Sequence, residues 1–115
     1  MTPVSTATNT AGQPIKAGAG PVAIAITPNG ATAYVVAGGH VIPISTATST
    51  ARKPIKVGSN PDAIAITPNG KTAYVVNYGN YPYDQGTVTP IQTATDTAGK
   101  AIKVGNEPEV IVITP

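Results

Sequence analysis

Short apolar segments alternate along the whole chain with turns rich in proline, glycine and asparagine. In residues 22–27, large Val and Ile side chains alternate with Ala, so an extended segment would have one bulky face and one small face. A strand with one face in water would carry polar residues in place of Ala23 and Ala25. The pattern therefore predicts a strand covered on both faces, with the bulky face of one strand nesting against the small face of another.

The chain repeats itself, with spacings of 40 and then 47 residues. The repeated blocks are residues 24–30, 64–70 and 111–115, and residues 3–8, 43–48 and 90–95. The longer second spacing indicates an insertion between Val76 and Thr89. A period near forty that contains several short strands predicts an array of β-propeller blades.

Each repeat is interpreted as four strands, at residues 22–27, 33–36, 41–46 and 54–57 in the first complete unit. The segment Pro28-Asn29-Gly30 has the chemistry of a tight turn between the first two strands. Pro43 removes a ladder hydrogen bond, so we expect a bulge or a break in the third strand.

Composition agrees with an all-β fold. The chain has no Leu, Phe, Trp or Cys, one Met and 12 Pro, which leaves little from which to build helices. A net charge of +2 with only 10% charged residues argues against nucleic-acid binding. The absence of Cys excludes disulfides and thiolate sites. The apolar runs are too short for a membrane span, and the N-terminus does not have the pattern of a signal peptide.

We predict a single partial β-propeller domain, residues 1–115, with about two and three-quarter four-stranded antiparallel blades, fewer than the roughly four that a closed ring needs. The units are half a blade at residues 1–18, complete blades at residues 20–58 and 60–105, and a lone inner strand at residues 107–115. We expect a fragment of a longer array whose open apolar blade faces self-associate.

The segments Tyr34-Val35-Val36 and Tyr74-Val75-Val76-Asn77 recur in phase with the Thr-Ala-Thr and Pro-Asn-Gly elements. These residues resemble the YVTN-type β-propeller repeat of bacterial and archaeal surface-layer and cell-surface proteins. Val replaces the Thr of that motif, and Ala37 stands where the next repeat has Asn77. The resemblance implies an extracellular or cell-surface protein that serves as a noncatalytic scaffold, or as a surface for adhesion or protein interaction.

The loops expected at one end of the blades are acidic and aromatic, whereas those at the other end are basic. Loops rich in Tyr offer a large contact area at a low entropic cost. The candidate residues for binding a protein or cell-surface partner are Tyr78, Tyr81, Tyr83, Asp84, Asp62, Glu109 and His40. Two alternatives remain open, namely that the insertion is a length variant with solvated charges and that His40 is structural or simply exposed.

No catalytic site, metal or cofactor is expected from the residues themselves. The Ser and Thr residues have no neighbouring base, no helix follows the glycines, and no loop has the dense oxygen ligands of a calcium site. We therefore expect that the chain is not an enzyme. The alternatives are a fragment of a lactonase-like or redox-cofactor propeller enzyme, which the resemblance also allows, and a nonfunctional gene remnant.

Overall fold

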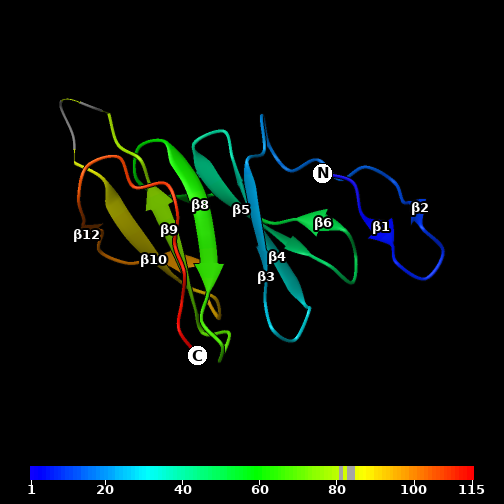
Figure 1. Ribbon diagram of the computed structural model, residues 1–115. Coiled ribbons are helices and arrows are strands. Elements are labelled where there is room, and N and C mark those ends of the chain that lie inside the picture. Colours follow the sequence, from blue (N-terminus) through cyan, green and yellow to red (C-terminus); the bar gives the residue numbers. More distant parts are fainter. Residues whose placement is uncertain (81, 83–84) are drawn as a thin grey trace.

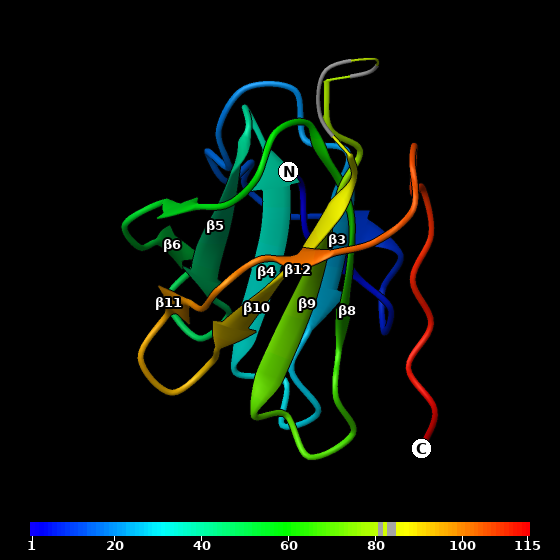
Figure 2. The same ribbon diagram turned by 90° about the vertical axis from the view of Figure 1, so that its left-hand side faces the viewer.

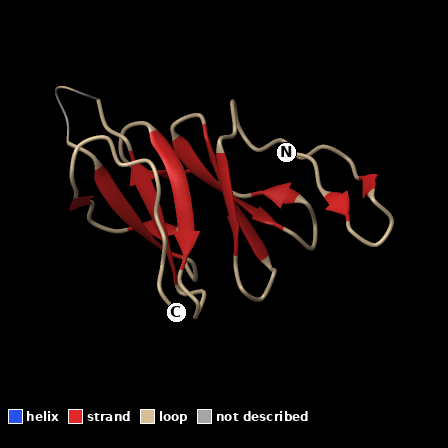
Figure 3. Ribbon diagram, viewed as in Figure 1, coloured by secondary structure: helices blue, strands red, loops and turns tan. Residues whose placement is uncertain are grey.

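The computed structural model describes residues 1–80, 82 and 85–115. Every regular element in these residues is a strand (Figures 1 and 3), which confirms the all-β prediction. The described part of the chain therefore contains no helix that could cross a membrane. The strands are β1 (Val4–Ser5), β2 (Thr10–Ala11), β3 (Ala23–Ile26), β4 (Thr32–Ala37), β5 (His40–Ser45), β6 (Thr50–Ala51), β7 (Ile55–Lys56), β8 (Pro61–Ile66), β9 (Thr72–Asn77), β10 (Thr87–Gln92), β11 (Thr97–Ala98) and β12 (Ile102–Lys103).

The strands form two sheets of the same design and one smaller pair. In the first blade, β3, β4 and β5 lie side by side in chain order, and the short strands β6 and β7 both pair with β5 on its outer side. The second blade repeats this arrangement with β8 to β12, while β1 and β2 form the N-terminal half-blade. The three units follow one another in a row (Figure 1), as expected for part of a β-propeller.

The predicted turn between the first two strands is stabilised by its own side chains. The Thr27 hydroxyl donates to Asn29 Oδ1 over 2.7 Å, and the Ala31 amide donates to the same oxygen over 3.0 Å. Gly30 has a φ of 74°, a conformation that glycine adopts without strain. The same bonds recur forty residues later, so the repeated sequence produces a repeated hairpin.

Pro43 affects the strand beside it rather than its own. Strand β5 runs without interruption through Pro43, which lies opposite Tyr34 of β4. The Pro43 carbonyl accepts from the Arg52 amide over 2.8 Å, so the proline nitrogen also faces the outer side of the sheet. Because this nitrogen offers no hydrogen, the outer strand divides into β6 and β7. The expected break is therefore real, but it lies in the fourth strand.

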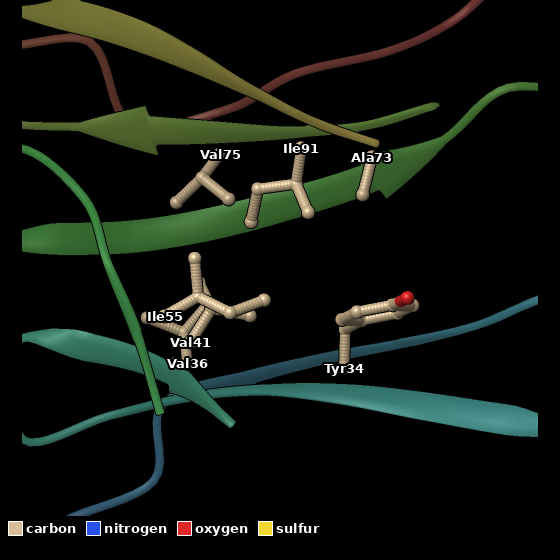
Figure 4. Close-up of a cluster of buried hydrophobic side chains, with 7 residues drawn as sticks. All are labelled: Tyr34, Val36, Val41, Ile55, Ala73, Val75 and Ile91. Atoms are coloured by element: carbon tan, nitrogen blue, oxygen red, sulfur yellow. The ribbon is translucent and has the colours of Figure 1, made fainter. Parts of the chain in front are cut away.

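The two blades pack face to face around a continuous apolar core (Figures 2 and 4). The cluster comprises Tyr34, Val36, Val41 and Ile55 from the first blade and Ala73, Val75 and Ile91 from the second. On the inner strands, the half-buried Ala23 packs at the edge of this cluster together with Ile64 and Ile66. The small face of β3 thus meets the bulky face of β8, as the alternation of Ala with Ile predicts.

A polar contact joins the same two blades at the end that carries the Pro-Asn-Gly turns. The fully buried Tyr34 donates its hydroxyl to Asp96 Oδ1 over 2.6 Å. Arg52 Nε lies 2.9 Å from the other oxygen of that carboxylate. Burial, followed by the hydrogen bond to Asp96, raises the pKa of Tyr34 far above its usual value. Tyr34 therefore remains a neutral donor across the physiological range.

Two predicted strands differ from the structure. The segment at residues 14–17 is joined to Met1 by a pair of backbone hydrogen bonds but is not assigned as a strand. The predicted inner strand at residues 107–115 is also not a strand. A ladder needs a neighbouring strand to supply donors and acceptors, and no strand among the described residues pairs with this segment.

Candidate functional site

The acidic end of the second blade is organised by Asn60, in the loop before β8. Asn60 adopts a left-handed conformation with a φ of 51°, and its carbonyl accepts from the Tyr78 amide over 2.9 Å. Its side-chain Nδ2 donates over 2.9 Å to the Gly79 carbonyl and over 2.9 Å to Asn80 Oδ1. This residue therefore joins the loop before β8 to the loop after β9 and sets the position of Tyr78.

Asp62 and Glu109 approach each other at this end. Burial raises the pKa of the Asp62 carboxyl, and the negative charge of Glu109 raises it further. Asp62 Oδ1 is buried and has no hydrogen-bond partner among the described residues. Glu109 is exposed to solvent. The pair is thus a partly desolvated carboxylate beside a solvated one, and a cation placed between them would relieve their repulsion.

Tyr78 lies beside the same carboxylates. Partial desolvation raises the pKa of its hydroxyl, and the charge and hydrogen bond of Glu107 add to the effect. Tyr78 also lines a hollow of about 330 Å³ between the two blades, together with Asp62, Asn60 and the glycine turn at Gly38 and Gly39. An aromatic ring and one carboxylate therefore line a groove between the blades, and two further carboxylates lie near that ring.

The structure groups some of the predicted site residues and separates others. It brings together Tyr78, Asp62 and Glu109. His40 is exposed, its ring Nδ1 lies 3.1 Å from the carbonyl of Gly38 in its own turn, and it does not line the hollow. The remaining candidates, Tyr81, Tyr83 and Asp84, lie outside the described residues.

Asn60 was missed from the sequence, and Glu107 was expected in the acidic loops at this end but was not chosen as a candidate residue. Both occupy the repeat position that Gly20 holds in the first blade, and all three have positive φ angles, of 51°, 54° and 56° respectively. A position that carries Gly and then Asn in successive repeats is the signal of a left-handed turn, and it could have been found in the sequence.

The chemistry available at this end is recognition of positive charge. No group of three or more His, Cys, Asp or Glu residues in the described chain is arranged to hold a metal ion. Asp62 lines the open hollow, and the exposed Glu107 and Glu109 lie near Tyr78, where a flexible cationic side chain could reach them. Tyr78 supplies an aromatic surface on which the apolar part of a Lys or Arg side chain can pack.

No family model and no curated protein matches the chain. Solved structures do match. Hydrazine synthase from Kuenenia stuttgartiensis is similar with a TM-score of 0.86 and 30% identity, over 93% of this chain and 30% of that one. A candidate 6-phosphogluconolactonase from Bacteroides uniformis is similar with a TM-score of 0.67 and 23% identity, over 91% of this chain and 32% of that one. The chain thus spans about a third of the length of each.

Both of these proteins are named as enzymes, which contradicts the expectation that the chain is not an enzyme. That expectation considered only the side chains of this chain and found no catalytic group on its inner strands. A propeller can assemble a site from the loops of all its blades, and this chain corresponds to about a third of either protein. The architecture is shown independently of function: two complete blades and a half-blade form part of a β-propeller.

Proposed function

We propose that this chain is a β-propeller segment whose acidic end binds a basic segment of a partner protein. The observation that carries the proposal is the gathering of three carboxylates, those of Asp62, Glu107 and Glu109, beside Tyr78. Two of these residues, Tyr78 and Asp62, line the hollow between the blades. The proposal concerns binding by this end of the blades, and it applies equally where the parent propeller is an enzyme.

The distribution of charge supports a cationic partner. The described residues hold four carboxylate side chains, and three of them, Asp62, Glu107 and Glu109, lie at this end. The fourth, Asp96, is engaged by Arg52 and Tyr34 at the other end. A basic segment would gain Coulomb attraction and lower the repulsion between Asp62 and Glu109 on binding.

A cell-surface setting is part of the same proposal. It is supported by the resemblance of residues 34–36 and 74–77 to the YVTN-type repeat. Limited proteolysis of intact source cells tests it, because a surface protein is cut before any cytoplasmic marker is released. If the protein resists proteolysis until the cells lyse, the cell-surface setting is wrong. The binding proposal does not depend on this result and is tested separately.

Binding is tested by fluorescence anisotropy with a labelled lysine-rich peptide and a glutamate-rich peptide of the same length. The lysine-rich peptide should bind, and its affinity should fall with added salt because the carboxylates are near the surface. Glu109→Gln should weaken binding by about twofold to fivefold, which corresponds to a solvent-exposed ion pair. Tyr78→Ala should weaken it further through the loss of packing.

The matched control is Asp96→Asn, which changes the net charge by the same amount as Glu109→Gln at the opposite end. It should leave peptide affinity unchanged. Equal binding of both peptides, or equal effects of the two substitutions, would show that this end of the blades is not the binding surface.

A further inference from the structure

A second hollow, of about 510 Å³, lies between the loop before β8, the loop after β9 and the outer strand β12. The polar residues that line this outer pocket are Ser59, Gln85, Thr87 and Lys103, and glycine and alanine complete its wall. Its volume is in the range of small-molecule sites, about 300–1,000 Å³. The outer pocket shares no lining residue with the hollow beside Tyr78, so it would take a ligand of its own.

Among the described residues, the outer pocket has one charged group, the ammonium of Lys103. Lys103 lies directly opposite Thr87 in the ladder of β10 and β12, so the two side chains are neighbours on one face of the sheet. Lys103 is exposed, and no described carboxylate lines the pocket or forms an ion pair with it. The hydroxyls of Ser59 and Thr87 and the amide of Gln85 can each donate a hydrogen bond. One positive charge beside several neutral donors suits a ligand with a single negative charge.

The Thr87 hydroxyl is oriented by the buried amide of Asn77. Asn77 is 0% exposed, and its Nδ2 donates to Thr87 Oγ1 over 3.0 Å and to Thr89 Oγ1 over 2.9 Å. Because Thr87 Oγ1 accepts this bond, the hydroxyl hydrogen remains available to a ligand in the pocket. Asn77 is therefore a positioning residue for the outer pocket.

This polar cluster replaces apolar residues of the preceding repeat. Ala37 and Ile42, the counterparts of Asn77 and Thr89, pack in an apolar cluster. Asn77 Oδ1 is buried and has no hydrogen-bond partner among the described residues, which lowers the stability of the fold. Polar residues that depart from the packing of the rest of a fold at a cost in stability are characteristic of functional sites.

Backbone hydrogen bonds hold the walls of the outer pocket in place. The Gly79 amide donates to the Ser59 carbonyl over 3.1 Å, which joins the loop after β9 to the loop before β8. Next to Gln85, the Gly86 carbonyl accepts from the Val104 amide over 3.0 Å, which joins the same loop to the segment after β12. Gln85 belongs to the insertion that lengthens the second repeat spacing. The insertion thus adds a donor to a pocket whose backbone is already fixed before a ligand binds.

We propose that the outer pocket binds a small organic monocarboxylate. The Lys103 ammonium faces the carboxylate, and Thr87 donates to it with the geometry that Asn77 sets. Ser59 and Gln85 supply the remaining donors. A phosphate dianion fits less well, because a single lysine would leave one of its charges without compensation. This site is independent of peptide binding at the acidic end.

The ligand class is tested by isothermal titration calorimetry with three probes of nearly equal size. They are butanoate, the neutral butanamide and the cationic n-butylammonium. Butanoate should bind with a Kd of about 1 mM, as a ligand of so few atoms allows. The other two should bind at least about tenfold more weakly. Failure of butanoate to bind, or equal or tighter binding of either other probe, would overturn the proposal.

The charge is tested by Lys103→Gln, which should weaken butanoate binding about tenfold, as expected for a hydrogen bond to a charged group. Lys103→Arg keeps the charge and should restore most of the affinity. The matched control is Lys16→Gln, because Lys16 is the exposed counterpart of Lys103 in the half-blade. It changes the net charge equally and should leave the affinity unchanged. Equal effects of Lys103→Gln and Lys16→Gln would show that the pocket is not the site.

The hydroxyl is tested by Thr87→Val, which should weaken butanoate binding about fivefold. Its control is Thr89→Val, since Thr89 is the other acceptor of the Asn77 amide but does not line the pocket. Both variants take one acceptor from Asn77, and urea unfolding measures the stability that each loses. Thr89→Val should keep the affinity of the natural chain. A loss of affinity that follows the loss of stability in both variants would assign Thr87 a structural role and overturn its place in the site.

Discussion

At the scale of single residues, equivalent positions of the repeat behave differently because they have different neighbours. Tyr34 is fully buried and bonded to Asp96, whereas Tyr74, one repeat later, is half-buried without a hydrogen-bond partner in the described chain. Ala37 packs in an apolar cluster, whereas its counterpart Asn77 is buried and donates to Thr89 Oγ1 over 2.9 Å. The repeat thus provides internal controls for the energetics of each contact.

Replacing Tyr34 by Phe removes the hydroxyl that reaches Asp96 across the contact between the blades. We expect the free energy of unfolding to fall by about 1.5 kcal/mol, because the lost bond joins a buried donor to a charged acceptor. Urea unfolding measures the change. Tyr74→Phe, the matched substitution, should change the free energy of unfolding by less than about 0.5 kcal/mol. Equal losses for the two variants would show that the contact with Asp96 is not the cause.

Replacing Asp62 by Asn removes a partly desolvated charge beside Glu109. The raised pKa means that the folded protein holds the Asp62 proton more tightly than the unfolded chain does. Stability conferred by this group therefore falls as pH rises through the interval between the two pKa values. We expect the variant to have a higher Tm at neutral pH, by about 2–4 °C, and no advantage near pH 3. A gain of the same size at both pH values would contradict this account.

At the scale of strands, the period and the alternation of Ala with Ile were enough to predict the two four-stranded blades and the way their faces nest. What could not be predicted was where each backbone group finds its partner. Pro43 was correctly associated with a break, but only the direction of its carbonyl shows that the break falls between β6 and β7. The loops at the acidic end were predicted to lie together, but the hydrogen bonds by which Asn60 joins two of them depend on loop conformations that a repeat pattern does not give.

Gly58, in the loop before β8, lies against the buried amide of Asn77. A Cβ at this position would lie 2.7 Å from Asn77 Cγ and 2.9 Å from Thr87 Oγ1. We expect Gly58→Ala to lower the free energy of unfolding by about 1–3 kcal/mol through overpacking, measured by urea unfolding. Gly105 is its repeat counterpart and has open space around it. The control Gly105→Ala should therefore be nearly neutral, and a comparable loss there would point to the backbone instead of the packing.

At the scale of the whole molecule, the blades, their order and their open ends follow from a self-comparison of the sequence. The structure adds that Val4 and Ile102 are strongly exposed at opposite ends of the row of blades. Their repeat counterparts, Ile91 and Ile55, are buried in one cluster between the two complete blades. The acidic end is only partly predictable. His40 is a residue type expected in a binding site, but its ring lies against the Gly38 carbonyl of its own turn. Function is the least accessible level, since the solved structures that share this fold are about three times as long as the matched region.

The divided outer strand limits the directions in which this architecture can grow. A continuous, unpaired outer edge would be a template for additional strands and hence for fibril formation. Here the nitrogens of Pro43 and Pro90 face the outer strand of their sheets and carry no hydrogen to donate to it. The outer strand is therefore divided into segments of only two residues, β6 and β7 in the first blade and β11 and β12 in the second. We therefore expect further blades to be added by packing sheet faces together, whereas pairing of another strand at this short, divided edge is disfavoured. In a chain so rich in Val, Ile and Thr, such an edge should lower the tendency to form amyloid-like aggregates.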